Sequence, residues 1–126
     1  MQKTFEIYDF KGLTLNSYRN WHYQKSNKIK KEFTLAMSAL KGYTFTPPLS
    51  VTYTVYKKHN RRFDLDNIVV IAKFFHDALV AHGCIQDDDA KTIREINFTF
   101  GGKADCDKIV VTIKELENGE VDTEGS

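Results

Sequence analysis

Apolar and polar side chains alternate along four short stretches of the chain. Because successive side chains of a strand point to opposite faces, this alternation predicts four half-buried β-strands. The glycines in the segment 101–105 predict a wide hairpin loop between the last two strands. The four predicted strands cover residues 3–9, 49–55, 96–100 and 109–113.

Two other stretches repeat their apolar residues every three or four positions, which is typical of amphipathic helices. The first helix is expected from about residue 25 to residue 40, with lysines on its outer face and Gly42 placed to end it. The second is expected over residues 68–79, with Gly83 as its end. The polar and aromatic segment 15–23 is expected to be a loop.

The order of these elements is β-α-β-α-β-β, which predicts an α+β fold with one sheet covered by two helices on one face. Helical crossovers imply some parallel pairing and the last two strands are expected to be antiparallel, so the sheet should be mixed. The chain has 126 residues, of which 41% are hydrophobic, and this is enough for one core. We expect a single domain over residues 1–116 and a flexible acidic tail over residues 117–126.

The sequence also indicates a compartment. No apolar run approaches the roughly 20 residues of a membrane helix, and the N-terminus lacks the apolar segment of a secretory signal. The two cysteines, Cys84 and Cys106, have no Cys or His partner at zinc-binding spacing. These features predict a cytoplasmic protein in a reducing environment, without membrane contact.

The net charge of +1 hides a segregation of charge along the chain. Five acidic residues and no Lys or Arg follow Lys114, whereas basic residues cluster over residues 19–31 and 57–62. A basic body with an acidic tail indicates a polyanionic partner, although two solvated charged faces would give the same pattern. The tail either only aids solubility or competes with this polyanion for the basic surface.

Two carboxylates, Asp64 and Asp66, flank Leu65 just before the second predicted helix. Side chains at positions i and i+2 of an extended chain point the same way, so both carboxylates can face one Mg²⁺ ion, which prefers oxygen ligands. The alternative is structural, since Asp66 or Asn67 would serve equally well to cap the helix.

Three adjacent carboxylates, Asp87, Asp88 and Asp89, follow the second predicted helix. They repel one another unless a cation or a basic group lies nearby. A loop that follows one strand and a loop that precedes another can meet at one edge of a sheet, so we expect this turn to approach Asp64 and Asp66. A solvated acidic turn is the alternative.

Lys73 lies seven residues after Asp66, which puts both on the same helix face to within about 20°. Its ammonium group either reaches solvent along the apolar helix or points at the acidic cluster and stabilises charge on a phosphate. The four histidines of the chain, by contrast, lie beside no nucleophile motif.

Several of these pieces occur together in an order that resembles the RusA-type Holliday junction resolvase family. That family carries a basic run before D-L-D-N, a helix with K-x-x-x-D-A-L, a glycine, and a D-D-A or D-D-S turn. The matching residues here are 61–67 (RRFDLDN), 73–79 (KFFHDAL), Gly83 and 88–90 (DDA), and residues 15–19 (LNSYR) are similar to the family's N-terminal loop. The resemblance spans roughly residues 5 to 116.

The resemblance implies a Mg²⁺-dependent endonuclease, with Mn²⁺ as a substitute, that works as a homodimer and needs no organic cofactor. Such enzymes resolve four-way (Holliday) DNA junctions in recombination and repair by paired symmetric nicks. The metal ligands correspond to Asp64, Asp66 and Asp89 and the catalytic lysine to Lys73, while the triple aspartate leaves Asp88 open as a replacement for Asp89. The residues expected to bind DNA are Asn16, Arg19, Lys28, Lys31, Arg61, Arg62 and Asn67.

Two other functions are compatible with the residues. One is a non-catalytic nucleic-acid-binding module in which Asp64 and Asp66 cap a helix, which gives no reason for three acidic positions to converge. The other is a metal-dependent phosphohydrolase acting on nucleotides. That function lacks a glycine-rich phosphate-binding loop here and leaves the two basic clusters unexplained.

Overall fold

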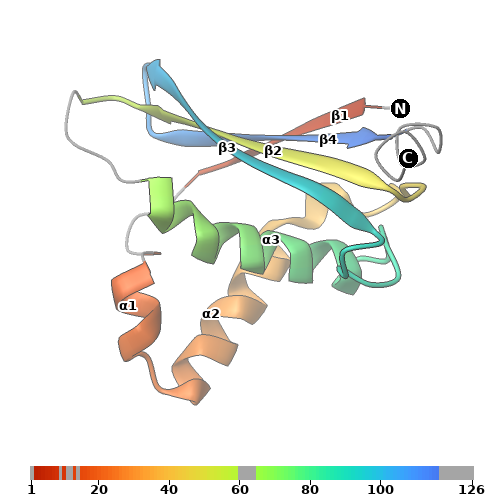
Figure 1. Ribbon diagram of the computed structural model, residues 1–126. Helices are drawn as coiled ribbons and strands as arrows, with labels where there is room; N and C mark the ends of the chain where they lie inside the picture. The colour runs from red at the N-terminus through yellow and green to blue at the C-terminus, as the bar shows by residue number, and fades with distance from the viewer. Residues whose placement is uncertain (1, 9, 11–12, 14, 60–64, 117–126) are drawn as a thin grey trace.

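The computed structural model describes residues 2–8, 10, 13, 15–59 and 65–116, with the backbone alone at Leu15, Asn16 and Asp66. The expected acidic tail, residues 117–126, lies outside the described residues. The strands are β1 (Gln2–Ile7), β2 (Leu49–Lys57), β3 (Ile93–Lys103) and β4 (Lys108–Glu115). The helices are α1 (Leu15–Asn20), α2 (Tyr23–Ala36) and α3 (Ile68–Ala81), with the short 3-10 turns η1 (Ser38–Leu40) and η2 (Leu65–Asn67) (Figure 1).

The four strands form one mixed sheet in the order β1-β4-β2-β3, which confirms the predicted α+β fold. β2 and β3 are parallel and are joined through α3, while β4 lies antiparallel to both β1 and β2. The predicted hairpin between the last two strands is wrong, because β4 pairs with β1 and β2 and not with β3. This order places β4 inside the sheet, where its backbone is paired on both edges and the side chains of Ile109, Val111 and Ile113 are fully buried.

The segment expected to be the hairpin loop instead extends β3 through Lys103. Gly101 lies under the Tyr56 ring of β2, where an added Cβ would come within 2.5 Å of the ring atom Cε1. This glycine is needed for close approach within the sheet rather than for a tight turn. The chain turns only after β3, where the Ala104 N–H donates to the carbonyl oxygen of Lys57.

All three helices lie on one face of the sheet, with α1 and α2 packed against α3 (Figure 1). The expected loop at residues 15–20 is wrong, because these residues form α1. Tyr18 of α1 packs against Phe74 of α3 and against Trp21, with ring centroids 6.0 Å apart in both pairs. Six residues are too few to be helical in isolation, so these tertiary contacts stabilise α1.

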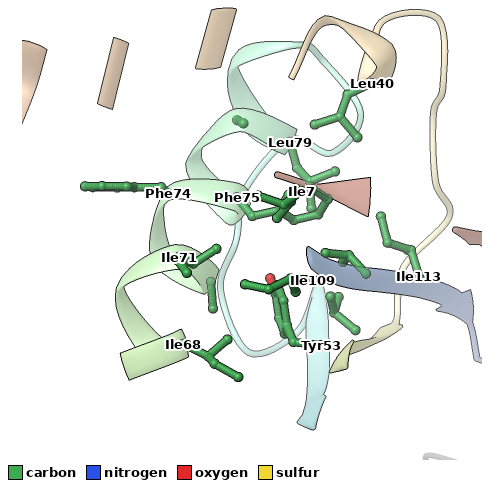
Figure 2. Packing of buried hydrophobic residues seen from close by; sticks show 14 of the residues in the cluster. Ile7, Leu40, Tyr53, Ile68, Ile71, Phe74, Phe75, Leu79, Ile109 and Ile113 are labelled. Atoms are coloured by element: carbon green, nitrogen blue, oxygen red, sulfur yellow. The ribbon is translucent and has the colours of Figure 1, made fainter. Parts of the chain in front are cut away.

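The core lies between the sheet and α3, where buried residues of β1, β2 and β4 face one side of the helix (Figure 2). On α3 the predicted apolar row is buried, and five further residues of the helix are buried as well; the row consists of Ile68, Ala72, Phe75 and Leu79. α2, by contrast, buries only Phe33. α3 is therefore the central helix, and α2 lies at the periphery.

Both predicted helices begin and end close to their expected positions. α3 ends at Ala81, and Gly83 follows with a φ of +77°, the left-handed conformation that ends a helix. α2 ends at Ala36, earlier than expected, and η1 occupies the residues before Gly42. Among the described residues, no helix has the length and apolar character needed to cross a membrane.

Two polar side chains, Tyr53 of β2 and His76 of α3, are buried in the core with ring centroids 5.9 Å apart. Neither the Tyr53 hydroxyl nor His76 Nε2 has a hydrogen-bond partner within the part of the chain that the structure describes. Burial raises the pKa of Tyr53 and lowers the pKa of His76. Both side chains therefore favour their neutral forms.

Candidate functional site

The N-terminal end of α3 carries the D-L-D-N segment. Leu65, Asp66 and Asn67 form η2, which runs directly into Ile68, the first residue of α3. Asn67 has a helical backbone conformation, with φ −68° and ψ −20°, and its side chain makes no capping hydrogen bond. The side chain of Asn67 therefore does not cap α3, and the capping role expected of Asp66 stays a prediction.

Several predicted site residues lie where the structure gives no side chain. Arg61, Arg62 and Asp64 lie outside the described residues. Asp66 and Asn16 are placed by their backbone only, in η2 and α1 respectively. The roles expected for these five residues stay predictions.

Lys73, on the second turn of α3, contacts Tyr18 of α1. Its Nζ lies 5.1 Å from the centroid of the Tyr18 ring, within the range of a cation–π interaction. A hydrogen bond with the Tyr18 side chain raises the pKa of Lys73, burial opposes this shift, and the negative charge of Asp77 adds to it. Lys73 is thus a positively charged group held at one position.

Tyr18 belongs to the LNSYR segment, far from Lys73 in the sequence. The contact between them brings this segment to the same end of α3 as the D-L-D-N segment. Sequence analysis did not identify Tyr18 as a partner of Lys73. The only available signal was its place beside Asn16 and Arg19 in that segment.

Beyond the C-terminal end of α3, Asp89 holds the turn that leads into β3. Its Oδ1 accepts hydrogen bonds from the backbone N–H groups of Lys91, at 3.2 Å, and Thr92, at 3.0 Å. Hydrogen bonds from Thr92 and Lys91 lower the pKa of Asp89. Asp89 is therefore an exposed, ionised carboxylate of fixed orientation, and turn formation accounts for it as well as metal binding does.

Asp88 has different surroundings from Asp89. Its backbone N–H donates to Asp87 Oδ1 at 2.7 Å. Burial lowers the pKa of His76 on α3, and the charges of Asp88 and Asp77 partly oppose that shift. The charge of Asp88 thus acts on the pKa of His76, whereas Asp89 is the carboxylate that its own turn orients.

The two acidic segments lie at opposite ends of α3, so the expectation that they meet at one edge of the sheet is wrong within a single chain. α3 has 14 residues, which corresponds to about 21 Å. Because β2 and β3 are parallel, η2 follows the C-terminal end of β2, whereas Asp89 precedes the N-terminal end of β3. Within the described ranges, no three His, Cys, Asp or Glu side chains are grouped to hold a metal ion.

The end of the sheet nearest to η2 carries lysines from three separate parts of the sequence. Lys57 and Lys103 are paired in register across β2 and β3, and Lys108 begins β4 at the same end. Lys57 Nζ also lies 3.2 Å from Asp107 Oδ2, and the backbone N–H of Lys58 donates to the same carboxylate. Sequence analysis missed Lys103 and Lys108, because only the strand order brings them beside Lys57.

The remaining residues predicted to bind DNA lie on α1 and α2. Arg19, Lys28 and Lys31 are exposed. Lys30 lies on α2 with Lys28 and Lys31. It forms an ion pair with Asp77 of α3 at 3.2 Å and so joins α2 to α3. Lys28 and Lys31 are therefore accessible to a polyanion, while Lys30 has a structural role.

No family model matches this chain, and no curated protein matches it. The resemblance to RusA-type resolvases thus rests on the motif residues.

Proposed function

We propose that this protein is a metal-dependent endonuclease that resolves four-way DNA junctions by paired nicks and works as a two-fold dimer. One observation carries the proposal: Tyr18 of the LNSYR segment lies against Lys73, on the helix whose start bears Asp66. Two motif segments that are distant in sequence share one end of α3. A common catalytic site requires such convergence, and the packing of Tyr18 against Phe74 is what holds α1 at this end of α3.

The dimer is part of the proposal because one chain does not bring its acidic segments together. A Mg²⁺ ion binds oxygens at about 2.1 Å, whereas α3, which separates Asp66 from Asp89 in the chain, is about 21 Å long. A two-fold dimer with antiparallel α3 helices would set Asp66 of one chain beside Asp89 of the other, and would do so twice. Two equivalent sites account for two symmetric incisions.

Asp64 and Asp66 of one chain and Asp89 of the second would hold the metal ion, Mg²⁺ or Mn²⁺. When bound, the ion supplies an activated water and neutralises charge on the scissile phosphate. Lys73, whose ammonium group lies over the Tyr18 ring, stabilises the negative charge that develops as the P–O bond breaks.

The exposed lysines supply the binding surface for the junction arms. Lys28 and Lys31 on α2 and Lys103 at the end of β3 contact phosphates, so affinity should fall steeply with salt. The cytoplasm is the proposed compartment. The two cysteines, Cys84 and Cys106, are both free, which is compatible with a reducing environment.

One assay separates this function from its two alternatives. The protein is incubated with a four-way junction, a linear duplex with the sequence of its arms, and nucleoside triphosphates, each with Mg²⁺ or with EDTA. We expect Mg²⁺-dependent paired nicks in the junction, with the duplex and the nucleotides left intact. Junction binding without cleavage would instead favour a binding module, and phosphate release from nucleotides would favour a phosphohydrolase.

A further inference from the structure

β3 forms one edge of the sheet and leaves apolar side chains exposed. Ile96 is 45% exposed and Phe100 is 53% exposed, while Phe98 between them is half-buried against Tyr53. The register with β2 puts these three residues opposite β2 residues that are fully buried on the helix side of the sheet. The apolar row of β3 therefore faces the helix layer, but the helices do not fully cover it.

The polar residues of β3 lie on the other face. Asn97 Nδ2 donates to Thr52 Oγ1 at 3.3 Å, and Thr99 Oγ1 donates to Thr54 Oγ1 at 3.0 Å. β3 has 11 residues and, among the described strands, pairs along one side only. A long apolar edge of this kind is a template for another strand.

We propose that β3 of a second copy of this chain pairs with β3 in antiparallel orientation, about a two-fold axis at Phe98. In this register Ile96 of each chain lies opposite Phe100 of the other, and Phe98 lies opposite itself. Asn97 lies opposite Thr99 on the other face. The apolar row is its own complement, as an interface between identical surfaces requires. The proposed function requires a dimer, and this inference names its surface.

Charge complementarity favours the same register. Ile93, at the start of β3, lies opposite Lys103, at the end of β3 in the second chain. The acidic turn 87–89 precedes Ile93. At the other end of β3, Lys103 is paired with Lys57 of β2, and Lys58 is the residue after Lys57. The three aspartates, partly offset by Lys91 and Arg94, therefore lie toward Lys103 and Lys58 of the other chain, twice in each dimer. This arrangement also brings the start of α3 in one chain toward the acidic turn of the other.

Disulfide formation at the axis tests the register. The variant Phe98→Cys, combined with Cys106→Ser, would place two cysteines directly opposite each other, with Cα atoms about 4.5 to 5.5 Å apart, which is within disulfide range. We expect a covalent dimer on mild oxidation without DNA. The control is Thr4→Cys with Cys106→Ser, on the other edge strand, and it should stay uncrosslinked. Equal crosslinking of both variants, or none at position 98, would overturn the proposed register.

An exposed residue gives a second test that leaves the core intact. Phe100→Lys places a charge opposite Ile96, and we expect the dimer dissociation constant from sedimentation to rise at least about tenfold, or 1.4 kcal/mol. Leu35→Lys on α2, where the leucine is 73% exposed, is the matched control and should leave the constant unchanged. Circular dichroism checks that both variants are folded.

A wild-type protein that sediments as a monomer at micromolar concentration would contradict the β3 interface, as would a dimer that Phe100→Lys leaves intact. In either case β3 serves another partner or none. These measurements need neither DNA nor metal. A wild-type monomer would also contradict the dimer that the proposed function requires, whereas a dimer that Phe100→Lys leaves intact would contradict the β3 interface alone, so the two failures are distinguishable.

Discussion

The two ends of α3 both belong to the candidate site, but they are built differently. At the N-terminal end, η2 places Asp66 at the helix start, and Lys73 is held against the Tyr18 ring. At the C-terminal end, Asp89 is held by backbone N–H groups of its own turn. One end supplies an oriented cation and the other an oriented anion. A site that needs both must take them from different chains.

Loss of a carboxylate at either end should have the largest effect on function. We expect Asp64→Asn, Asp66→Asn and Asp89→Asn each to slow junction cleavage by about 10²- to 10³-fold, because a bound metal contributes several kcal/mol to the barrier. Junction binding, measured by mobility shift in EDTA, should persist or tighten, because carboxylates near phosphate repel it when no metal is bound. Asp88→Asn is the control, with a milder effect. Full activity of a variant at limiting Mg²⁺ would remove its residue from the ligand set.

The N-terminal end alone should depend on the contact between Lys73 and Tyr18. We expect Lys73→Met to slow cleavage by about 10²-fold, since it removes a charge that stabilises the transition state. Tyr18→Phe keeps the ring and removes the hydroxyl, and should lower kcat by about 2- to 10-fold with KM unchanged. Tyr23→Phe, at a tyrosine that is 74% exposed, is the control. A normal kcat for Tyr18→Phe would mean that the ring alone positions Lys73.

The C-terminal end should respond to mild acid. The pKa of His76 is lowered by burial, so the unfolded state takes up a proton more readily, and stability is lost as the pH falls below the ordinary value of about 6.5. The thermal unfolding midpoint should therefore fall between about pH 7.5 and pH 5.5, and His76→Gln should flatten this dependence. Asp88→Asn should make the fall of the unfolding midpoint with pH steeper, because the negative charge of Asp88 partly opposes the lowering of the His76 pKa. A slope that His76→Gln leaves unchanged would assign the acid sensitivity to other groups.

Tyr53 of β2, which packs against Phe75 in the middle of α3, is the reference for both ends, and the effect expected of its substitution is the smallest. Tyr53→Phe removes a buried hydroxyl that has no partner within the described part of the chain. We expect the free energy of unfolding, measured with urea, to rise by roughly 1 kcal/mol, with cleavage unchanged. A loss of stability would mean that the hydroxyl makes a favourable interaction in solution.

The fold could be predicted from the sequence wherever a face is apolar along its whole length. β2, β4 and α3 have such faces, and their periodicity was sufficient. Strand order was not predictable, because Ile96, Phe98 and Phe100 of the edge strand alternate as clearly as the residues of the central β4. α1 escaped prediction because the packing of Tyr18, rather than periodicity, stabilises it.

The candidate site was predictable as a set of residues but not as an arrangement. The motifs identified Lys73 and Asp89, and each has an oriented side chain. Lys73 and Asp89 are separated because β2 and β3 are parallel. α3 returns the chain from the C-terminal end of β2 to the N-terminal end of β3, so its two ends lie at opposite ends of the strands. The role of Tyr18 also depends on tertiary packing, which local sequence does not encode.

The most direct test of the account asks whether the two ends of α3 act across chains. Asp66→Asn and Asp89→Asn proteins, each inactive alone, are mixed, allowed to exchange subunits, and assayed on a four-way junction with Mg²⁺. In a mixed dimer, one of the two sites keeps both carboxylates, one from each chain. We predict that the mixture regains nicking of a single strand. If the carboxylates act within one chain, every mixed dimer holds two broken sites, and the mixture would stay as inactive as its parents.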